Sequence, residues 1–239
     1  WTQQYLKDFF AIAKVGFIFT SLSLIMTLID SKKIFIFDLD GTLVDAYKAI
    51  EDSLNYTRKK LGYHKVSYKK VKESVGRGDK NFIKTFFEKK DIKKALEIYR
   101  KHHKKSLLKY AKLKKGTLSL LNFLKKNKKI IALASNRPKV FTLLILKKLS
   151  IRKYFDMVLC ADEINSHKPS PKILNNILKR FSLNKKDALY IGDMDIDLET
   201  AKRAKIDAVF IKGGSSKLSD VKKYKEKIVI SSLKELYER

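Results

Sequence analysis

Two aspartates, Asp38 and Asp40, stand at the end of the apolar run Ile34–Phe37 and are followed by Gly41 and Thr42. Alternate side chains of an extended chain point the same way, so both carboxylates are expected to face one side. Two like charges this close need a cation or a shared proton between them. Alone, the Asp-Gly-Thr segment is equally compatible with a turn followed by a helix cap, so the interpretation depends on the rest of the chain.

Polar residues also follow three later apolar runs. The runs are Ile130–Ala134, Phe155–Cys160 and Ala188–Ile191, and the polar residues after them are Ser135, Asn136, Lys168, Asp193 and Asp197. The carboxyl ends of parallel strands share one edge of a sheet, so we expect these residues to gather there. Carboxylates, a hydroxyl and a lysine suit a hard divalent cation and an anion, and oxygen ligands favour Mg²⁺. The histidines show no zinc-ligand spacing and are interpreted as solvated or structural: His64, His102, His103 and His167.

The elements that must position these residues alternate between strand and helix. Helical patterns cover residues 117–126, 140–149 and 173–181, a further helix ends at Ala204, and Ala208–Ile211 reads as a strand. This alternation predicts an α/β fold with a doubly wound, Rossmann-like parallel sheet and right-handed crossovers.

Residues 46–111 interrupt this rhythm. Helical patterns cover Tyr47–Leu61, the apolar cluster from Phe82 to Phe87, and Ile92–Leu108, without any strand-like run. We therefore predict an all-helical inserted subdomain over 46–111, with the catalytic core made of 32–45 and 112–239.

The segment Gly76-Arg77-Gly78 lies inside this insertion. No strand precedes it, so it does not predict a dinucleotide-binding loop, and a mobile turn is the favoured interpretation. The alternative is that Arg77 or Lys80 reaches the active site and binds an anionic part of the substrate.

Composition limits the class of protein. The chain has 239 residues and is 44% hydrophobic, enough for one sizeable core with an inserted subdomain. Its single cysteine, Cys160, excludes an internal disulfide, fits a reducing compartment, and is interpreted as a buried inert thiol after an apolar run. The net charge of +29 is carried mainly by lysines spread over the whole chain, a pattern that favours anionic substrates without identifying a nucleic-acid or membrane partner.

The first 31 residues form a hydrophobic segment with three interpretations. From Phe9 to Ile29, Lys14 is the only charge, so a membrane anchor is one interpretation, with Lys32 and Lys33 keeping the following chain in the cytoplasm. The favoured interpretation is an extension upstream of a start at Met26, and an amphipathic helix packed on the core is the third.

The order of motifs resembles a known superfamily. Asp38-x-Asp40-Gly41-Thr42, then Ser135, then Lys168-Pro-x-Pro, then Gly192-Asp193-x-x-x-Asp197 is similar to the four motifs of the haloacid dehalogenase superfamily of aspartyl-phosphate phosphatases. The resemblance spans Ile34 to about Gly214, and the helical insertion resembles the small cap of the phosphoglycolate phosphatase-like branch. The dehalogenases proper lack an aspartate at the position of Asp40.

This resemblance implies a mechanism and roles for the residues. Asp38 would be the nucleophile and Asp40 the general acid and base, with a pKa raised by nearby carboxylates. Mg²⁺ would be held by the Asp38 carboxylate, the Asp40 carbonyl, Asp193 and Asp197. The phosphoryl group would be bound by Ser135, Lys168 and backbone amides near Gly41 and Asn136, with Thr42 orienting the loop.

The function implied is a cytoplasmic, Mg²⁺-dependent phosphatase acting on a small phosphorylated metabolite similar to phosphoglycolate. A sugar-phosphate mutase, a pyrophosphatase and a nucleotidase use the same machinery and remain alternatives. A nucleic-acid-associated protein, suggested by the charge, and a membrane-tethered protein, suggested by the first segment, are alternatives of other classes.

Overall fold

The computed structural model describes residues 27–224 and 228–238, and these residues form a six-stranded parallel sheet in the order β5-β4-β1-β6-β7-β8. The strands are β1 (Ile34–Phe37), β4 (Ile130–Ser135), β5 (Met157–Cys160), β6 (Ala188–Gly192), β7 (Asp207–Ile211) and β8 (Ile228–Ile230). The strand order changes direction at β1, which lies between β4 and β6. Ligands of open α/β sheets bind at such a switch point.

The register of the central strands aligns their carboxyl ends. Phe37, the last residue of β1, pairs with Leu133 of β4 and Ile191 of β6. The residues that follow these three positions therefore lie side by side at one edge of the sheet.

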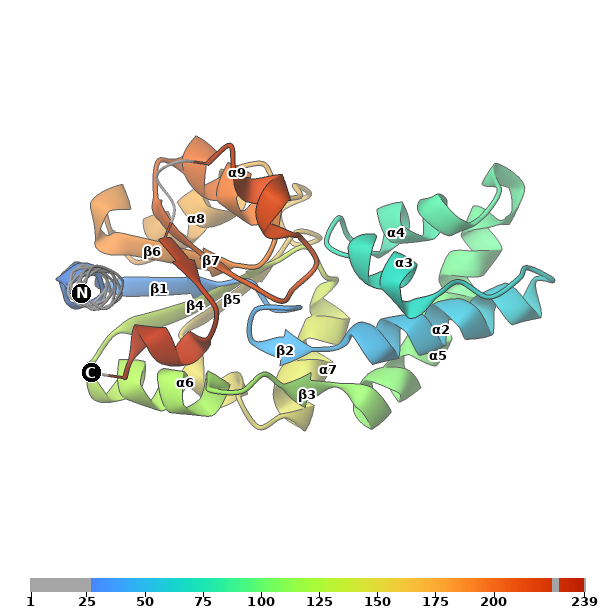
Figure 1. Cartoon of the computed structure of the whole chain (residues 1–239), viewed down its shortest axis with the longest axis horizontal. Helices are drawn as coiled ribbons and strands as arrows, with labels where there is room; N and C mark the ends of the chain where they lie inside the picture. Colours follow the sequence, from blue (N-terminus) through green and yellow to red (C-terminus); the bar gives the residue numbers. More distant parts are fainter. Residues whose placement is uncertain (1–26, 225–227, 239) are drawn as a thin grey trace, which may run out of the picture.

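Helices cover both faces of the sheet, as Figure 1 shows. The helices of the core are α6 (Thr117–Lys126), α7 (Lys139–Lys148), α8 (Lys172–Arg180) and α9 (Asp195–Ala204). Phe35 and Phe37 belong to the apolar cluster that α6 and α7 cover, whereas Ile34 and Ile36 belong to the cluster under α8 and α9. Because β1 is buried on both faces, it is a continuous apolar run instead of an alternating one.

The inserted helices form a unit with its own apolar core at one end of the molecule (Figure 1). They are α2 (Tyr47–Lys60), α3 (Tyr68–Glu73), α4 (Asp79–Phe86) and α5 (Ile92–Tyr110). The chain leaves the core through β2 (Val44–Asp45) and returns through β3 (Lys112–Leu113), and these two short strands pair antiparallel. The remaining turns are the 3₁₀ helices η1 (Lys89–Asp91), η2 (Arg152–Tyr154), η3 (Lys185–Asp187), η4 (Leu218–Val221) and η5 (Leu233–Leu236).

The predicted α/β class with its doubly wound parallel sheet is confirmed. The elements that were not predicted are short: helix α3, the edge strand β8, the paired strands β2 and β3, and the 3₁₀ helices. Helix α3 has one buried side chain, Val71, β8 has three residues, and β2 and β3 have two residues each. The predicted strand from Phe155 begins two residues later, because Phe155 ends the turn that follows η2.

The predicted N-terminal segment lies mostly outside the described residues. Ile29, just inside them, is 2% exposed and packs in the core cluster under α6 and α7. Within residues 27–224 and 228–238, no helix combines the length and the apolar character needed to cross a membrane.

Candidate active site

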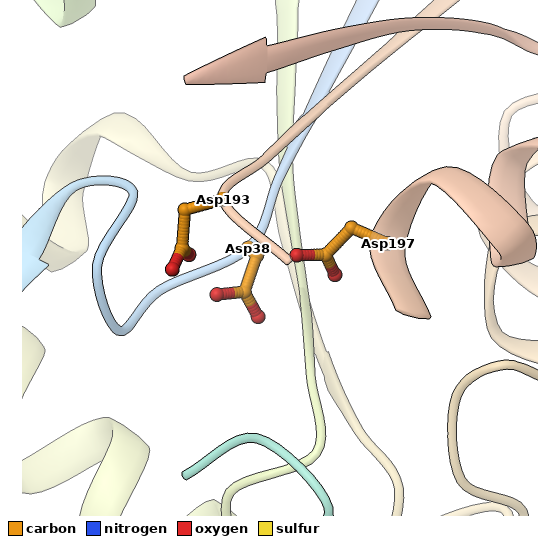
Figure 2. Close-up of side chains that lie close together, drawn as sticks. All are labelled: Asp38, Asp193 and Asp197. Atoms are coloured by element: carbon orange, nitrogen blue, oxygen red, sulfur yellow. The ribbon is translucent and has the colours of Figure 1, made fainter. Parts of the chain in front are cut away.

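Three buried carboxylates meet at the edge of the sheet where β1 and β6 end. Asp38 follows β1, Asp193 follows β6, and Asp197 lies in the first turn of α9; each offers an oxygen within 4.8 Å of the others. Figure 2 shows the three side chains turned toward one another. Their positions follow from the strand register, because the backbone N–H of Asp38 donates to the carbonyl oxygen of Ile191 at 2.9 Å.

Lys168 is the cation that contacts this cluster among the described residues. Its Nζ donates to Asp38 Oδ1 at 2.6 Å, to Asp197 Oδ1 at 2.7 Å and to the hydroxyl of Tyr190 at 2.9 Å. Burial alone would lower the pKa of Lys168, but the Asp197 and Asp38 carboxylates outweigh it and raise this pKa well above its usual value. Lys168 is therefore a permanently charged partner of the cluster.

The three carboxylates of the cluster outnumber the one ammonium group that contacts them. Burial raises the pKa of Asp38 well above its usual value, against the opposing effect of Lys168, and the Asp197 and Asp193 carboxylates raise it further. Burial and the Asp197 carboxylate raise the pKa of Asp193 to about 6. When all four groups are ionised, the three carboxylates exceed the ammonium group by two negative charges, which a divalent cation would balance. Their hard oxygen donors fit Mg²⁺.

Asp193 is oriented by a set of donors from two loops. Thr42 Oγ1 donates to its Oδ1 at 2.9 Å, and the backbone N–H of Ser215 donates to its Oδ2 at 2.8 Å. The hydroxyl of Tyr47, from the start of α2, lies 3.3 Å from the same Oδ2. The side chain of Thr42 thus orients a predicted metal ligand.

Gly41 is required by the close approach of these groups. Its φ is +87°, and a Cβ at this position would collide with Asp193 Oδ2 and the hydroxyl of Tyr47. Glycine lets the loop after β1 turn tightly against Asp193.

Asp40 does not face the other carboxylates. Its two carboxylate oxygens accept from Arg137, with Nε to Oδ2 at 2.7 Å and Nη2 to Oδ1 at 2.9 Å. The neighbour of Asp40 is thus the guanidinium of Arg137, in place of the carboxylates that were expected to surround it.

Arg137 also connects the core to the inserted unit. Its Nη1 donates to Nε2 of His103, on α5, at 2.7 Å, which places the imidazole proton on Nδ1, 3.0 Å from Ser53 Oγ. Burial and the guanidinium of Arg137 lower the pKa of His103 well below its usual value, so the ring is neutral. His103 fulfils the expectation of a structural histidine, here at the border of the site.

The side chains of Ser135, at the end of β4, and Asn136, directly after it, make specific hydrogen bonds. Ser135 is buried, and its Oγ accepts from the backbone N–H of Arg137 at 3.1 Å. The amide of Asn136 accepts from the backbone N–H of Lys168 at 2.8 Å and donates to the carbonyl oxygen of Gly76 at 2.9 Å. The side chain of Asn136 therefore fixes the loop that carries Lys168 and contacts the inserted unit. Because the side chain is used in this way, the backbone of Asn136 is the part expected to contact a ligand.

Arg77 is not brought into the site. It is exposed, whereas its neighbours Gly76 and Gly78 line the pocket between the inserted unit and the core. The pocket contains Asp38, Asp40, Ser135, Asn136, Arg137 and Lys168 at its core side, and its opposite wall is mainly apolar.

Three other residues lie outside the site. Asp45 accepts from the backbone N–H of Tyr47 at 3.3 Å at the junction with the insertion. Asp195 begins α9 and is half-buried. Cys160 is buried, and burial raises the pKa of its thiol to about 12, as expected for an inert residue.

Sequence reasoning missed Arg137, His103, Tyr47 and Tyr190. Tyr190 carries the only hydroxyl in the apolar run of β6, and Arg137 follows Ser135 and Asn136 directly, so both had a local signal. His103 and Tyr47 had none, because their role depends on how the inserted helices pack on the core.

Comparisons with known proteins agree with this geometry. A family model described as haloacid dehalogenase-like hydrolase matches residues 35–211. A phosphoglycolate phosphatase of Aquifex aeolicus is 31% identical over 172 residues, which cover 72% of this chain and 81% of that protein. A phosphoglycolate phosphatase of Colwellia psychrerythraea is 29% identical over 210 residues, covering 82% of this chain and 91% of that protein. The solved structure of a haloacid dehalogenase-like family hydrolase from Streptococcus pneumoniae has a TM-score of 0.72 at 26% identity, covering 83% of this chain and 94% of that chain.

Proposed function

The chain belongs to the haloacid dehalogenase-like hydrolases and is a phosphatase, and we propose that it hydrolyses a small phosphomonoester with Mg²⁺ through an aspartyl-phosphate intermediate. The observation that carries this proposal is the buried Asp38 carboxylate, 2.6 Å from Lys168 Nζ and gathered with Asp193 and Asp197. A carboxylate nucleophile, a fixed cation and a cluster of hard oxygen donors are the parts that phosphoryl transfer to aspartate requires.

The first step is the attack of an Asp38 carboxylate oxygen on phosphorus. The bond from phosphorus to the ester oxygen breaks, and the phosphoryl group passes to Asp38. Lys168 offsets the repulsion between the carboxylate and the phosphoryl oxygens, while Ser135 and the backbone amides after β1 and β4 bind those oxygens. Mg²⁺ held by Asp38, Asp193, Asp197 and the backbone carbonyl of Asp40 would supply charge neutralisation to the same oxygens.

Asp40 acts as the general acid in the first step and as the general base in the second. It gives a proton to the departing alcohol in the first step and takes one from the water that hydrolyses the aspartyl-phosphate in the second. Arg137 fixes the orientation of Asp40 by donating to both of its carboxylate oxygens.

The inserted helices 46–111 act, in this proposal, as a cap over the core made of 32–45 and 112–239. Their contacts with the core through Asn136 and Arg137 support it. The names of the relatives put phosphoglycolate first among the substrates to be assayed. A cytoplasmic location fits the single free cysteine, Cys160.

The test is phosphate release by the full chain from a panel of phosphomonoesters, with Mg²⁺ and with a chelator in excess. We expect phosphate release to depend on the metal. When the reaction is quenched in acid, mass spectrometry of the peptides should find one phosphoryl group on Asp38. Release that is unaffected by the chelator, or a phosphoryl group on another residue, would refute the mechanism.

A further inference from the structure

Within the described part of the chain, the pocket offers a bound ester no unpaired cation. Among the described residues, the basic side chains that line it are Lys168 and Arg137. Lys168 donates to two carboxylates and one phenol, and Arg137 donates to both oxygens of Asp40 and to His103. Both cations are therefore already neutralised by groups of the protein.

Arg137 is not available to a second anionic group of the substrate. Its guanidinium holds Asp40 by two parallel hydrogen bonds, and both side chains are largely buried, at 8% and 13% exposure. An alcohol that carries an anionic group could bind the guanidinium of Arg137 only by displacing Asp40. The displaced carboxylate would be buried without its partner, which is strongly unfavourable. Asp40 is also the general acid that protonates the departing alcohol, so its displacement would slow the reaction.

The charged residue that the inserted unit contributes to the pocket is already paired. Asp79, at the start of α4, lines it and is paired with Arg100, from Nε to Oδ2 at 2.6 Å and from Nη2 to Oδ1 at 3.2 Å. Arg100 does not line the pocket, and neither Arg77 nor Lys80 does. Among the described residues, the side of the pocket that faces the departing alcohol thus carries one carboxylate, which is paired with Arg100, and no unpaired ammonium or guanidinium group.

The remaining lining is apolar and preformed. It comes from both units and consists of Ile50, Val75, Phe82, Tyr99, Phe141 and Met194. All six are buried, and the rings of Phe82 and Tyr99 pack with their centres 5.9 Å apart. Such a wall favours binding of an apolar alcohol, whereas a charged group on the alcohol would lose its hydration there without gaining a partner.

We propose that the enzyme selects phosphomonoesters whose alcohol is uncharged and largely apolar, and discriminates against alcohols that carry a second anionic group. This inference rests on the proposed phosphatase function and narrows its substrate class. It predicts that phosphoglycolate, whose alcohol carries a carboxylate, is a poor substrate of this chain despite the names of its relatives.

The experiment compares three esters of primary alcohols in the presence of Mg²⁺: isobutyl phosphate, phosphoglycolamide and phosphoglycolate. The amide is the neutral isostere of the carboxylate, so their ratio isolates the charge. We expect kcat/KM for phosphoglycolamide to exceed that for phosphoglycolate by about tenfold or more, with isobutyl phosphate the best of the three. Equal rates or a preference for phosphoglycolate would overturn the inference, whereas hydrolysis of none of the three would overturn the proposed function and the inference with it.

A matched pair of variants tests the cause. Val75 lies in the turn before α4 at the pocket wall, so Val75→Lys adds a cation there and Val75→Met adds similar length without charge. We expect Val75→Lys to raise the ratio of phosphoglycolate to phosphoglycolamide turnover about tenfold and Val75→Met to leave it unchanged. An unchanged ratio in folded Val75→Lys would contradict the charge argument, and the wild-type comparison decides the proposal if this variant does not fold.

Discussion

Asp38 combines a nucleophilic carboxylate with a strongly constrained environment. Substituting it by asparagine keeps the shape of the side chain and removes the nucleophile, so we expect turnover to fall by about 10³-fold or more. Phosphate release measures the loss, and circular dichroism with thermal unfolding checks that the fold persists. Substantial remaining activity in folded Asp38→Asn would contradict the assignment of the nucleophile.

Asp193 is expected to determine the metal requirement. Asp193→Asn removes one charged ligand, so the Mg²⁺ concentration for half-maximal phosphate release should rise by about tenfold or more. Asp220→Asn, which changes an exposed carboxylate far from the cluster, is the matched control and should leave the Mg²⁺ requirement unchanged. Equal requirements in the two variants would refute this ligand.

The residues that sequence analysis predicted for the site are those whose position depends only on the end of a strand. Asp38, Ser135 and Asp193 follow apolar runs, so locating the strands was enough to bring them together. His103 depends on contacts between helix α5 and the loop after β4, which no local pattern encodes. The arginine that reaches the site is Arg137, whereas the predicted Arg77 stays on the surface, since a side chain in a turn can point either way.

Helix α5 is the element that joins the two units, and its docking depends on a neutral His103. The unfolded chain takes up a proton at this histidine below about pH 6.5, whereas the folded protein, whose His103 pKa is lowered, does not. The unfolded state then binds more protons than the folded state, so stability is complete above pH 6.5 and is lost as the pH falls.

His103→Gln should remove this part of the pH dependence. Between pH 8 and pH 5.5, we expect the wild-type free energy of unfolding to decrease by roughly 1 kcal/mol more than that of the variant, measured by urea unfolding. His64→Gln, at an exposed position, is the control and should behave as the wild type. Identical pH dependence of His103→Gln and the wild type would show that the folded protein tolerates a charged His103.

At the level of elements, long patterns predicted well and short ones did not. The helix over 117–126 was predicted with its observed bounds, because a buried stripe including Leu120, Leu121 and Leu124 repeats at helical spacing. β8 pairs with β7 as an edge strand of three residues, and α3 spans six, too few for periodicity to appear. Their existence follows from the tertiary fold instead of from local sequence.

The whole molecule carries a net charge of +29, which should act on the rate at which anionic substrates arrive. We expect kcat/KM to fall by about threefold between 50 and 200 mM NaCl while kcat stays constant, because screening weakens long-range attraction without altering the site. Steady-state kinetics of phosphate release measures both constants. A change confined to kcat would contradict the steering interpretation.

The same titration tests the nucleic-acid hypothesis. Duplex DNA should inhibit turnover only at the lower salt concentration, as expected for binding by diffuse charge. Tight inhibition that persists at 200 mM NaCl would favour a nucleic-acid partner over a metabolite phosphatase.

The central position of β1 has a consequence for how the protein is made. Its residues leave the ribosome before those of β4 and β6, so Ile34 finds its neighbours only when Ile130 and then Ala188 have been synthesised. Until then, the four residues that are fully buried in the native sheet are an exposed apolar strand with two unpaired edges, followed by the whole helical insertion. Such a segment is prone to aggregation in a nascent chain. The strand that organises the active site is therefore the one whose folding must wait longest, and chaperone protection during translation should matter more for this core than for the self-contained helical unit.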